Sequence, residues 1–166
     1  DDRIGRANMA GNLALIYSRL GRFEDALKAN QFDLDVATEL GDRHGIATTL
    51  GNRGSIYEAQ KNLAMALACH RRAAQIEEEL GHGWDAARHG AAIAHLLHLM
   101  GDDDAALAEY ERAIPVLNAH GALYYVVQPL LDSAEIHYRR ANLATAGELN
   151  RNAHAIAQNL GLQSHA

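Results

Sequence analysis

The sequence predicts an all-α fold, an α-solenoid of about four antiparallel helix pairs. The first observation behind this prediction is a forty-residue period, marked by Gly41, Gly81, Gly121 and Gly161. A fixed period of this length is typical of repeat arrays, in which each unit buries its apolar face against its neighbours. The second observation is the composition, since 48% of the 166 residues are hydrophobic but only 5% are aromatic and two are proline. Such a chain can bury a core and favours helices over strands.

Each forty-residue unit is expected to contain two helices. We predict the first helices at residues 3–19, 43–59, 83–99 and 123–139, and the second helices at residues 23–40, 63–80, 103–120 and 143–160. Apolar residues recur along them every three or four positions, as one buried face of an α-helix requires. The connections inside the units are short and make paired helices antiparallel. The period glycines are expected to end the second helices in a left-handed conformation.

Pro115 and Pro129 fall inside predicted helices. Each removes one backbone hydrogen bond and crowds the preceding turn. We expect a local bend or a helix restart at each proline, with a hinge as the alternative.

Charge and composition exclude several classes of function. The formal net charge is −6, and no block of basic residues is present, which disfavours nucleic-acid binding. No apolar run approaches the length of a membrane span, so no membrane contact is expected. Cys69 is the only cysteine, which excludes an intrachain disulfide and favours a cytoplasmic location. We expect one domain over residues 1–166, with repeats at approximately 1–40, 41–80, 81–120 and 121–160, cut from a longer protein.

Three short motifs resemble the tetratricopeptide repeat family in its forty-residue form. They are NLALIY at residues 12–17, GRFEDAL at residues 21–27 and NRGSIY at residues 52–57. The later repeats depart from the pattern, with Leu97 and His137 at the tyrosine position. The dipeptides around the glycines look like repeats of kinesin light chains, of Leu-Gly-Asn polarity adaptors and of bacterial signalling proteins. The Ala- and Arg-rich usage favours the bacterial group.

The resemblance implies a right-handed superhelix whose concave groove is lined by the first helices and takes a peptide or a partner domain. The function it implies is a protein–protein interaction module, a regulatory or scaffolding segment of a larger signalling protein. The residues expected to line the groove are Asn8, Asn12, Thr48, Asn52, Arg88, His95, His98, Asp132 and Glu135. Asparagine suits this task because its amide both donates to and accepts from a peptide backbone.

An alternative is a structural array that forms homo-oligomers. The last helix pair is expected to leave an uncapped apolar flank through Ile136, Leu149 and their neighbours. Exposed apolar patches of this kind favour association.

Catalysis, cofactor binding and metal binding are not expected. His95 and His98 lie one helical turn apart, and His89 or Glu135 could join them. A metal needs three or four converging ligands, and only these two are predicted to be close. We therefore interpret the histidines as polar groove residues, with pH-sensitive partner binding as a second hypothesis. The acidic run at residues 102–104 is interpreted as a helix start and not as a catalytic group.

Overall fold

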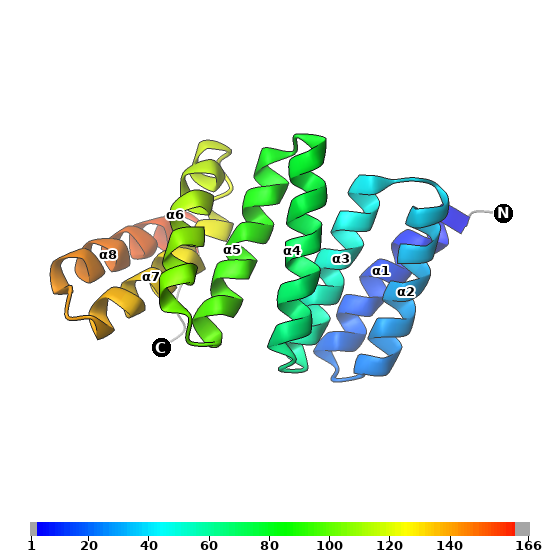
Figure 1. The fold of residues 1–166 in the computed structure, drawn as a ribbon, viewed down its shortest axis with the longest axis horizontal. Helices are drawn as coiled ribbons and strands as arrows, with labels where there is room; N and C mark the ends of the chain where they lie inside the picture. The colour runs from blue at the N-terminus through cyan, green and yellow to red at the C-terminus, as the bar shows by residue number, and fades with distance from the viewer. Residues whose placement is uncertain (1–2, 162–166) are drawn as a thin grey trace. The chain divides into compact units, whose positions relative to one another are not determined.

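The computed structural model describes residues 3–161, apart from the side chains of Ile4 and Asn8. Over this range the chain forms eight α-helices and no strand (Figure 1). The helices are α1 Arg3–Arg19, α2 Phe23–Glu39, α3 Arg43–Ala59, α4 Leu63–Leu80, α5 Gly83–Leu99, α6 Asp103–Ala119, α7 Tyr124–Arg139 and α8 Leu143–Asn159. Every predicted boundary agrees within one residue, which confirms the all-α fold of consecutive helix pairs.

The helices form two compact units, residues 1–89 and residues 90–166, with the boundary inside α5. In the first unit, α1 packs against α2 and α3 packs against α4 (Figure 1). Helix α3 also contacts both α1 and α2, so the two pairs share one core. In the second unit, α7 packs against α8 and contacts α6.

Small side chains let the paired helices approach closely. One alanine of each second helix is buried at the same place in the forty-residue register, at Ala26, Ala66, Ala106 and Ala146. In the first unit, Ala26 forms a core cluster with Ala14 and Ile56. A few larger residues between these alanines therefore fill the core. The forty-residue period in the sequence reflects the repeated positions of buried side chains.

The period glycines adopt the left-handed conformation that their position predicts. Gly41, Gly81, Gly121 and Gly161 have φ angles between +66° and +76°. The turns inside the repeats need the same conformation, which Gly21 and Gly101 supply. Lys61 and Ala141 stand at that position in the other two repeats, with φ of 62° and 59°. A side chain in this conformation costs roughly 1–2 kcal/mol.

The two prolines lie inside continuous helices. Helix α6 continues past Pro115 and α7 continues past Pro129, so the expected helix restart is wrong. The Ser133 hydroxyl donates a 2.7 Å hydrogen bond to the carbonyl oxygen of Pro129. The donor of this bond lies in the same helix, one turn after the proline.

A buried polar residue at one register position of the second helix bonds to the first helix that follows. The three pairs are Asn30 with the carbonyl oxygen of Thr49, His70 with His89, and Tyr110 with Asp132. All six residues are buried. We call these three contacts the polar clasps, and each uses different chemistry to join consecutive repeats.

The apolar surface of the last helix pair differs from the expectation. Ile136 is fully buried, so its predicted exposure is wrong, and Leu149 is half-buried. The exposed apolar side chains there include Leu131, Tyr138 and Leu143. They border a shallow depression of about 450 Å³ on α7 and α8. Ile136 is covered because it lies on the side of α7 that packs into the second unit, whereas Tyr138 lies on the outer side.

Candidate functional site

In the first unit, predicted groove residues lie on two neighbouring first helices, α1 and α3, which contact each other. Asn12 and Thr48 are exposed, and Asn52 is half-buried. Asn12 and Asn52 occupy the same register position forty residues apart, so their amides belong to the same face of adjacent repeats. The side chain of Asn8 lies outside the described residues. This face therefore presents uncharged groups that both donate and accept hydrogen bonds.

Arg88, also predicted for the groove, contacts residues of its own helix. Its Nη2 atom lies 3.3 Å from Nε2 of His89 and 3.7 Å from Oδ1 of Asp85. The guanidinium also lies 5.9 Å from the centre of the Trp84 ring. The cation is thus held in place by neighbours one to four residues away, and a partner carboxylate would compete with Asp85.

In the second unit, Asp132 is the centre of a hydrogen-bond network. Its carboxylate accepts from Nδ1 of His95 at 2.7 Å, from Nε2 of Gln128 at 2.6 Å and from the hydroxyl of Tyr110. Burial by itself would raise the pKa of Asp132, but the hydrogen bonds from His95, Tyr110 and Gln128 outweigh it and lower that pKa. Burial and the adjacent carboxylate raise the pKa of Tyr110 far above its usual range. The network joins α5, α6 and α7 within the unit.

His98 belongs to a separate group of charged residues. Its Nδ1 atom lies 2.8 Å from Oδ1 of Asp103, and its Nε2 atom lies 3.9 Å from Oε2 of Glu135. Arg139 adds a donor 3.0 Å from Asp103. His95 and His98 therefore face different carboxylates. Glu135 itself is exposed, with 61% of its side chain accessible.

His89, which the sequence had offered as a third member of that group, lies instead against His70. Their Nδ1 atoms are 3.3 Å apart, and both rings are buried. Arg88 has only donors to offer, so Nε2 of His89 accepts and the ring carries its proton on Nδ1. That N–H donates to Nδ1 of His70. Burial, and secondarily the charge of Arg88, lower the pKa of His70 to about 4 and that of His89 to about 3.

Two glycines of α3 make room for this histidine pair. A Cβ atom on Gly51 would lie 2.6 Å from Cε1 of His89, and one on Gly54 would lie 2.6 Å from Nε2 of His70. Real Cβ contacts are never so short. The glycines are therefore required by close approach and not by backbone conformation.

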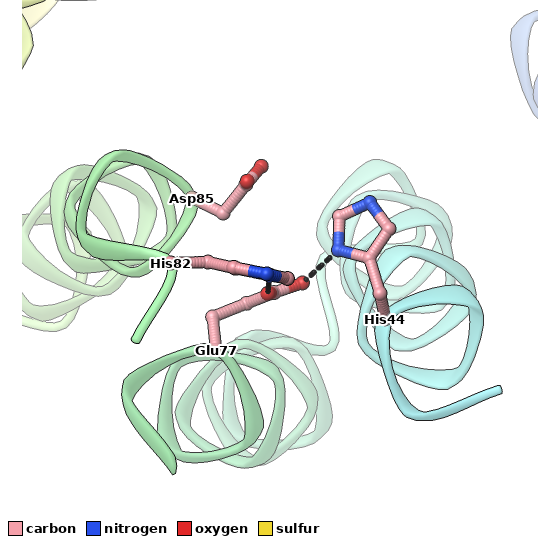
Figure 2. A group of neighbouring side chains, drawn as sticks. All are labelled: His44, Glu77, His82 and Asp85. Atoms are coloured by element: carbon pink, nitrogen blue, oxygen red, sulfur yellow. Dashed lines mark hydrogen bonds and ion pairs between the residues drawn. The ribbon is translucent and has the colours of Figure 1, made fainter. Parts of the chain in front are cut away.

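A second group of titratable side chains gathers in the first unit, at residues that the sequence analysis did not single out. His44, Glu77, His82 and Asp85 each place one possible ligand atom within 4.8 Å of the others (Figure 2). Nδ1 of His44 lies 2.9 Å from Oε1 of Glu77, and Nδ1 of His82 lies 2.8 Å from Oε2. The two imidazole rings meet edge to face, with centres 5.2 Å apart. Glu77 is fully buried.

Local structure explains how these four side chains converge. His44 lies in the first turn of α3, and Glu77 lies in the last turn of α4. Gly81 then turns the chain with φ of 76°, and the amide of His82 donates to the carbonyl of Glu77 at 2.9 Å. That turn brings the His82 ring back over the Glu77 carboxylate. Asp85 follows in the first turn of α5, where a negative charge is favoured by the helix dipole.

The sequence did contain a sign of this group. At the register position of Glu77 the other repeats carry Ala37, Leu117 and Ala157. A buried carboxylate at an apolar position of a repeat array needs compensating partners. The forty-residue period reveals the exception, although it does not reveal which side chains meet it.

Comparison with known proteins identifies the pattern. The family model described as tetratricopeptide repeat matches residues 5–79 and, in an overlapping placement, residues 45–119. Among curated protein sequences, none matches this chain. Over residues 3–161, no helix combines the length and the hydropathy that crossing a bilayer requires.

Three solved structures have a similar fold. BtubC (BKLC) from P. vanneervenii is 18% identical with a TM-score of 0.78, covering 96% of this chain and 66% of that chain. Aspartyl phosphate phosphatase F from Bacillus subtilis is 17% identical with a TM-score of 0.88, covering 97% of this chain and 42% of that one. A STAND signal transduction ATPase with a tetratricopeptide repeat sensor, from Pyrococcus horikoshii, is 15% identical with a TM-score of 0.80, covering 95% and 25%. This chain thus spans two thirds or less of each of these proteins.

Proposed function

Because the chain belongs to the tetratricopeptide repeat family, we propose that it captures a peptide or a partner domain on the face formed by its first helices. The family is typically a non-catalytic module for protein–protein interaction, and the proposed role is binding without catalysis. The observation that carries the proposal is the pair of asparagines, Asn12 and Asn52, at one register position of two contacting helices.

The chemistry of this face suits an extended peptide. Each asparagine amide can donate to a backbone carbonyl and accept from a backbone N–H, whatever the peptide's side chains are. Thr48 adds an exposed hydroxyl on the same face of α3. None of these groups is charged, so binding to them would depend little on salt.

The second unit offers a different surface. Asp132 is bonded to three side chains, and His95 is bonded to Asp132. Of the predicted groove residues in that unit, Glu135 is the most exposed, and a basic or amide group of a partner would meet it first. Each unit thus offers its own recognition chemistry, with uncharged hydrogen-bonding groups in the first and an exposed carboxylate in the second.

A regulatory or scaffolding place in a larger bacterial signalling protein is the broader proposal. Its support is the fold shared with a STAND protein, in which the repeats are described as a sensor, and with a phosphatase of aspartyl phosphate. A cytoplasmic location is part of this proposal, since a single cysteine excludes an intrachain disulfide.

Affinity capture with matched variants tests the binding face. The wild-type chain and Asn118→Ala, an exposed asparagine on the second helix α6, should retain the same partner from a proteome digest or a peptide library. Asn12→Ala combined with Asn52→Ala should weaken binding of that partner at least about tenfold, since each loses a two-way hydrogen bond. Equal retention by the double variant and by Asn118→Ala would rule out this face.

Self-association is the second candidate function, favoured by the depression between α7 and α8. Leu131, Tyr138 and Leu143 are exposed around it, and such apolar surface favours association with another copy. Light scattering over a range of concentrations measures this directly. A monomer at high concentration, with no change on Tyr138→Ser, would exclude it.

A further inference from the structure

We propose that His44, Glu77, His82 and Asp85 form a structural zinc site that joins α3, α4 and the start of α5. The four residues come from three helices and one turn of the first unit, yet their ligand atoms lie within 4.8 Å of one another (Figure 2). The proposal does not rest on the proposed binding function.

The types of side chain select the class of metal. Two imidazoles and two carboxylates match the nitrogen and oxygen ligands that Zn²⁺ takes in four-coordinate sites. Mg²⁺ and Ca²⁺ prefer oxygen alone, and the group contains no thiolate for Cu(I). With four protein ligands the coordination is closed, which is the arrangement of a structural rather than a catalytic site.

The geometry requires only small movements. In a tetrahedral zinc site, bonds of about 2.0–2.2 Å set the ligand atoms roughly 3.3 Å apart. The atoms here are at most 4.8 Å apart. About half of each imidazole is exposed, 51% for His44 and 44% for His82, so both rings can rotate. Glu77 is the fixed member, because its side chain is fully buried.

The hydrogen bonds of the group pre-orient the ligands. Each imidazole now directs Nδ1 at one oxygen of Glu77. Coordination through Nδ1 places the proton of the ring on Nε2, and the metal then occupies the space between carboxylate and imidazoles. Asp85 has a competing cation in Arg88, but the ion pair is long, at 3.7 Å. A compact positive charge would be a stronger partner for Asp85.

The competing explanation is that Glu77 is only a buried carboxylate held by two histidines. It accounts for the two short hydrogen bonds, but it does not require Asp85 within the same group. It also predicts no selective uptake of metal. Metal titration therefore separates the two explanations.

The experiment uses the chain without a polyhistidine tag, treated with EDTA and dialysed, and measures Zn²⁺ binding by calorimetry. The expected result is one site per chain with a Kd of about 0.1 μM or tighter, the weak end of the range for structural zinc. His44→Ala and His82→Ala should each weaken binding at least about a hundredfold, more than the loss of a residue that only orients a ligand. Each variant removes one partner of the buried Glu77, so circular dichroism in EDTA first checks that both variants are folded.

His120→Ala and His154→Ala are the matched controls, since these exposed histidines lie in the second unit and outside the group. They should bind Zn²⁺ as the wild type does. Zn²⁺ should also raise the Tm of the wild type and of the controls, but not that of His44→Ala. Co²⁺ should give the visible absorption of a tetrahedral complex. The proposal is overturned if the wild type shows no such site, or if His44→Ala and His82→Ala bind as tightly as the controls.

Discussion

Acidification from pH 7 to pH 5 should destabilise the first unit through the buried pair His70 and His89. Both rings are buried; the hydrogen bond between their Nδ1 atoms needs His70 to be neutral, and the contact of Arg88 with Nε2 of His89 needs His89 to be neutral. Their pKa values are lowered to about 4 and about 3 by burial and by Arg88. In the unfolded chain a histidine has a pKa of about 6.5, so the unfolded state takes up protons first as the pH falls.

The magnitude follows from that difference. Stability from each ring is fully present above about pH 6.5 and falls as the pH decreases toward its lowered pKa. At pH 5 the unfolded histidines are mostly protonated and the folded ones are not. The span of about 1.5 pH units corresponds to a loss of about 2 kcal/mol for each ring, or about 4 kcal/mol for the pair, at about 1.4 kcal/mol per unit.

Urea unfolding followed by the fluorescence of Trp84 measures this loss. Trp84 is the only tryptophan and lies in the first unit, so its signal reports on the unit that contains the pair. EDTA in all samples keeps the zinc site out of the comparison. His70→Asn, which leaves an acceptor near the place of Nδ1, should halve the loss to about 2 kcal/mol. The control His120→Asn, at an exposed site, should leave it unchanged. A wild-type loss below about 1 kcal/mol, or an undiminished loss in His70→Asn, would refute the reasoning.

Three further predictions concern stability, each measured by chemical or thermal unfolding. Gly54→Ala should destabilise the protein by about 1–3 kcal/mol despite the better helix propensity of alanine, because the new Cβ meets the buried ring of His70. Adding His70→Ala should reduce the cost of the glycine substitution. Additive effects of the two substitutions would contradict this explanation. Lys61→Gly should stabilise the protein by about 0.5–1 kcal/mol, since the φ angle of Lys61 is 62°. The neighbouring Gln60→Gly should destabilise the protein, because the φ angle of Gln60 is −75°. A stabilising Gln60→Gly would argue against a conformational cause. Asp132→Asn should cost about 2–4 kcal/mol, because three donors lose a charged acceptor, and a neutral outcome would show that the network contributes little.

The forty-residue period was sufficient to predict the helices because each boundary depends on local chemistry. A glycine after each second helix sets a left-handed turn, and the alanine register sets the buried face. These features recur in every repeat, so a helix boundary that is ambiguous in one repeat can be inferred from the other repeats. The prolines were harder to interpret, since a proline's effect depends on whether its helix is held by neighbours.

The side-chain groups could not be predicted in the same way, because they depend on departures from the repeat. Glu77 stands out against Ala37 and Leu117, but its partner His44 lies 33 residues away on another helix. Asp132 occupies the position of Asn12 and Asn52, and its burial results from Tyr110 and other donors around it. The period shows that such a residue is different; only the packing shows what it meets.

The polar clasps have a consequence for how an array of this kind changes in length. Repeat arrays grow and shrink when whole units are duplicated or deleted. In this chain Asn30 of the first repeat bonds to a backbone carbonyl of the next repeat, His70 of the second repeat bonds to an imidazole, and Tyr110 of the third repeat bonds to a carboxylate. Removal of a forty-residue unit would bring together partners that were never paired, such as Asn30 with His89. Each repeat can thus form its polar clasp with its own neighbour but not with the others, so the polar clasps fix the order of the repeats.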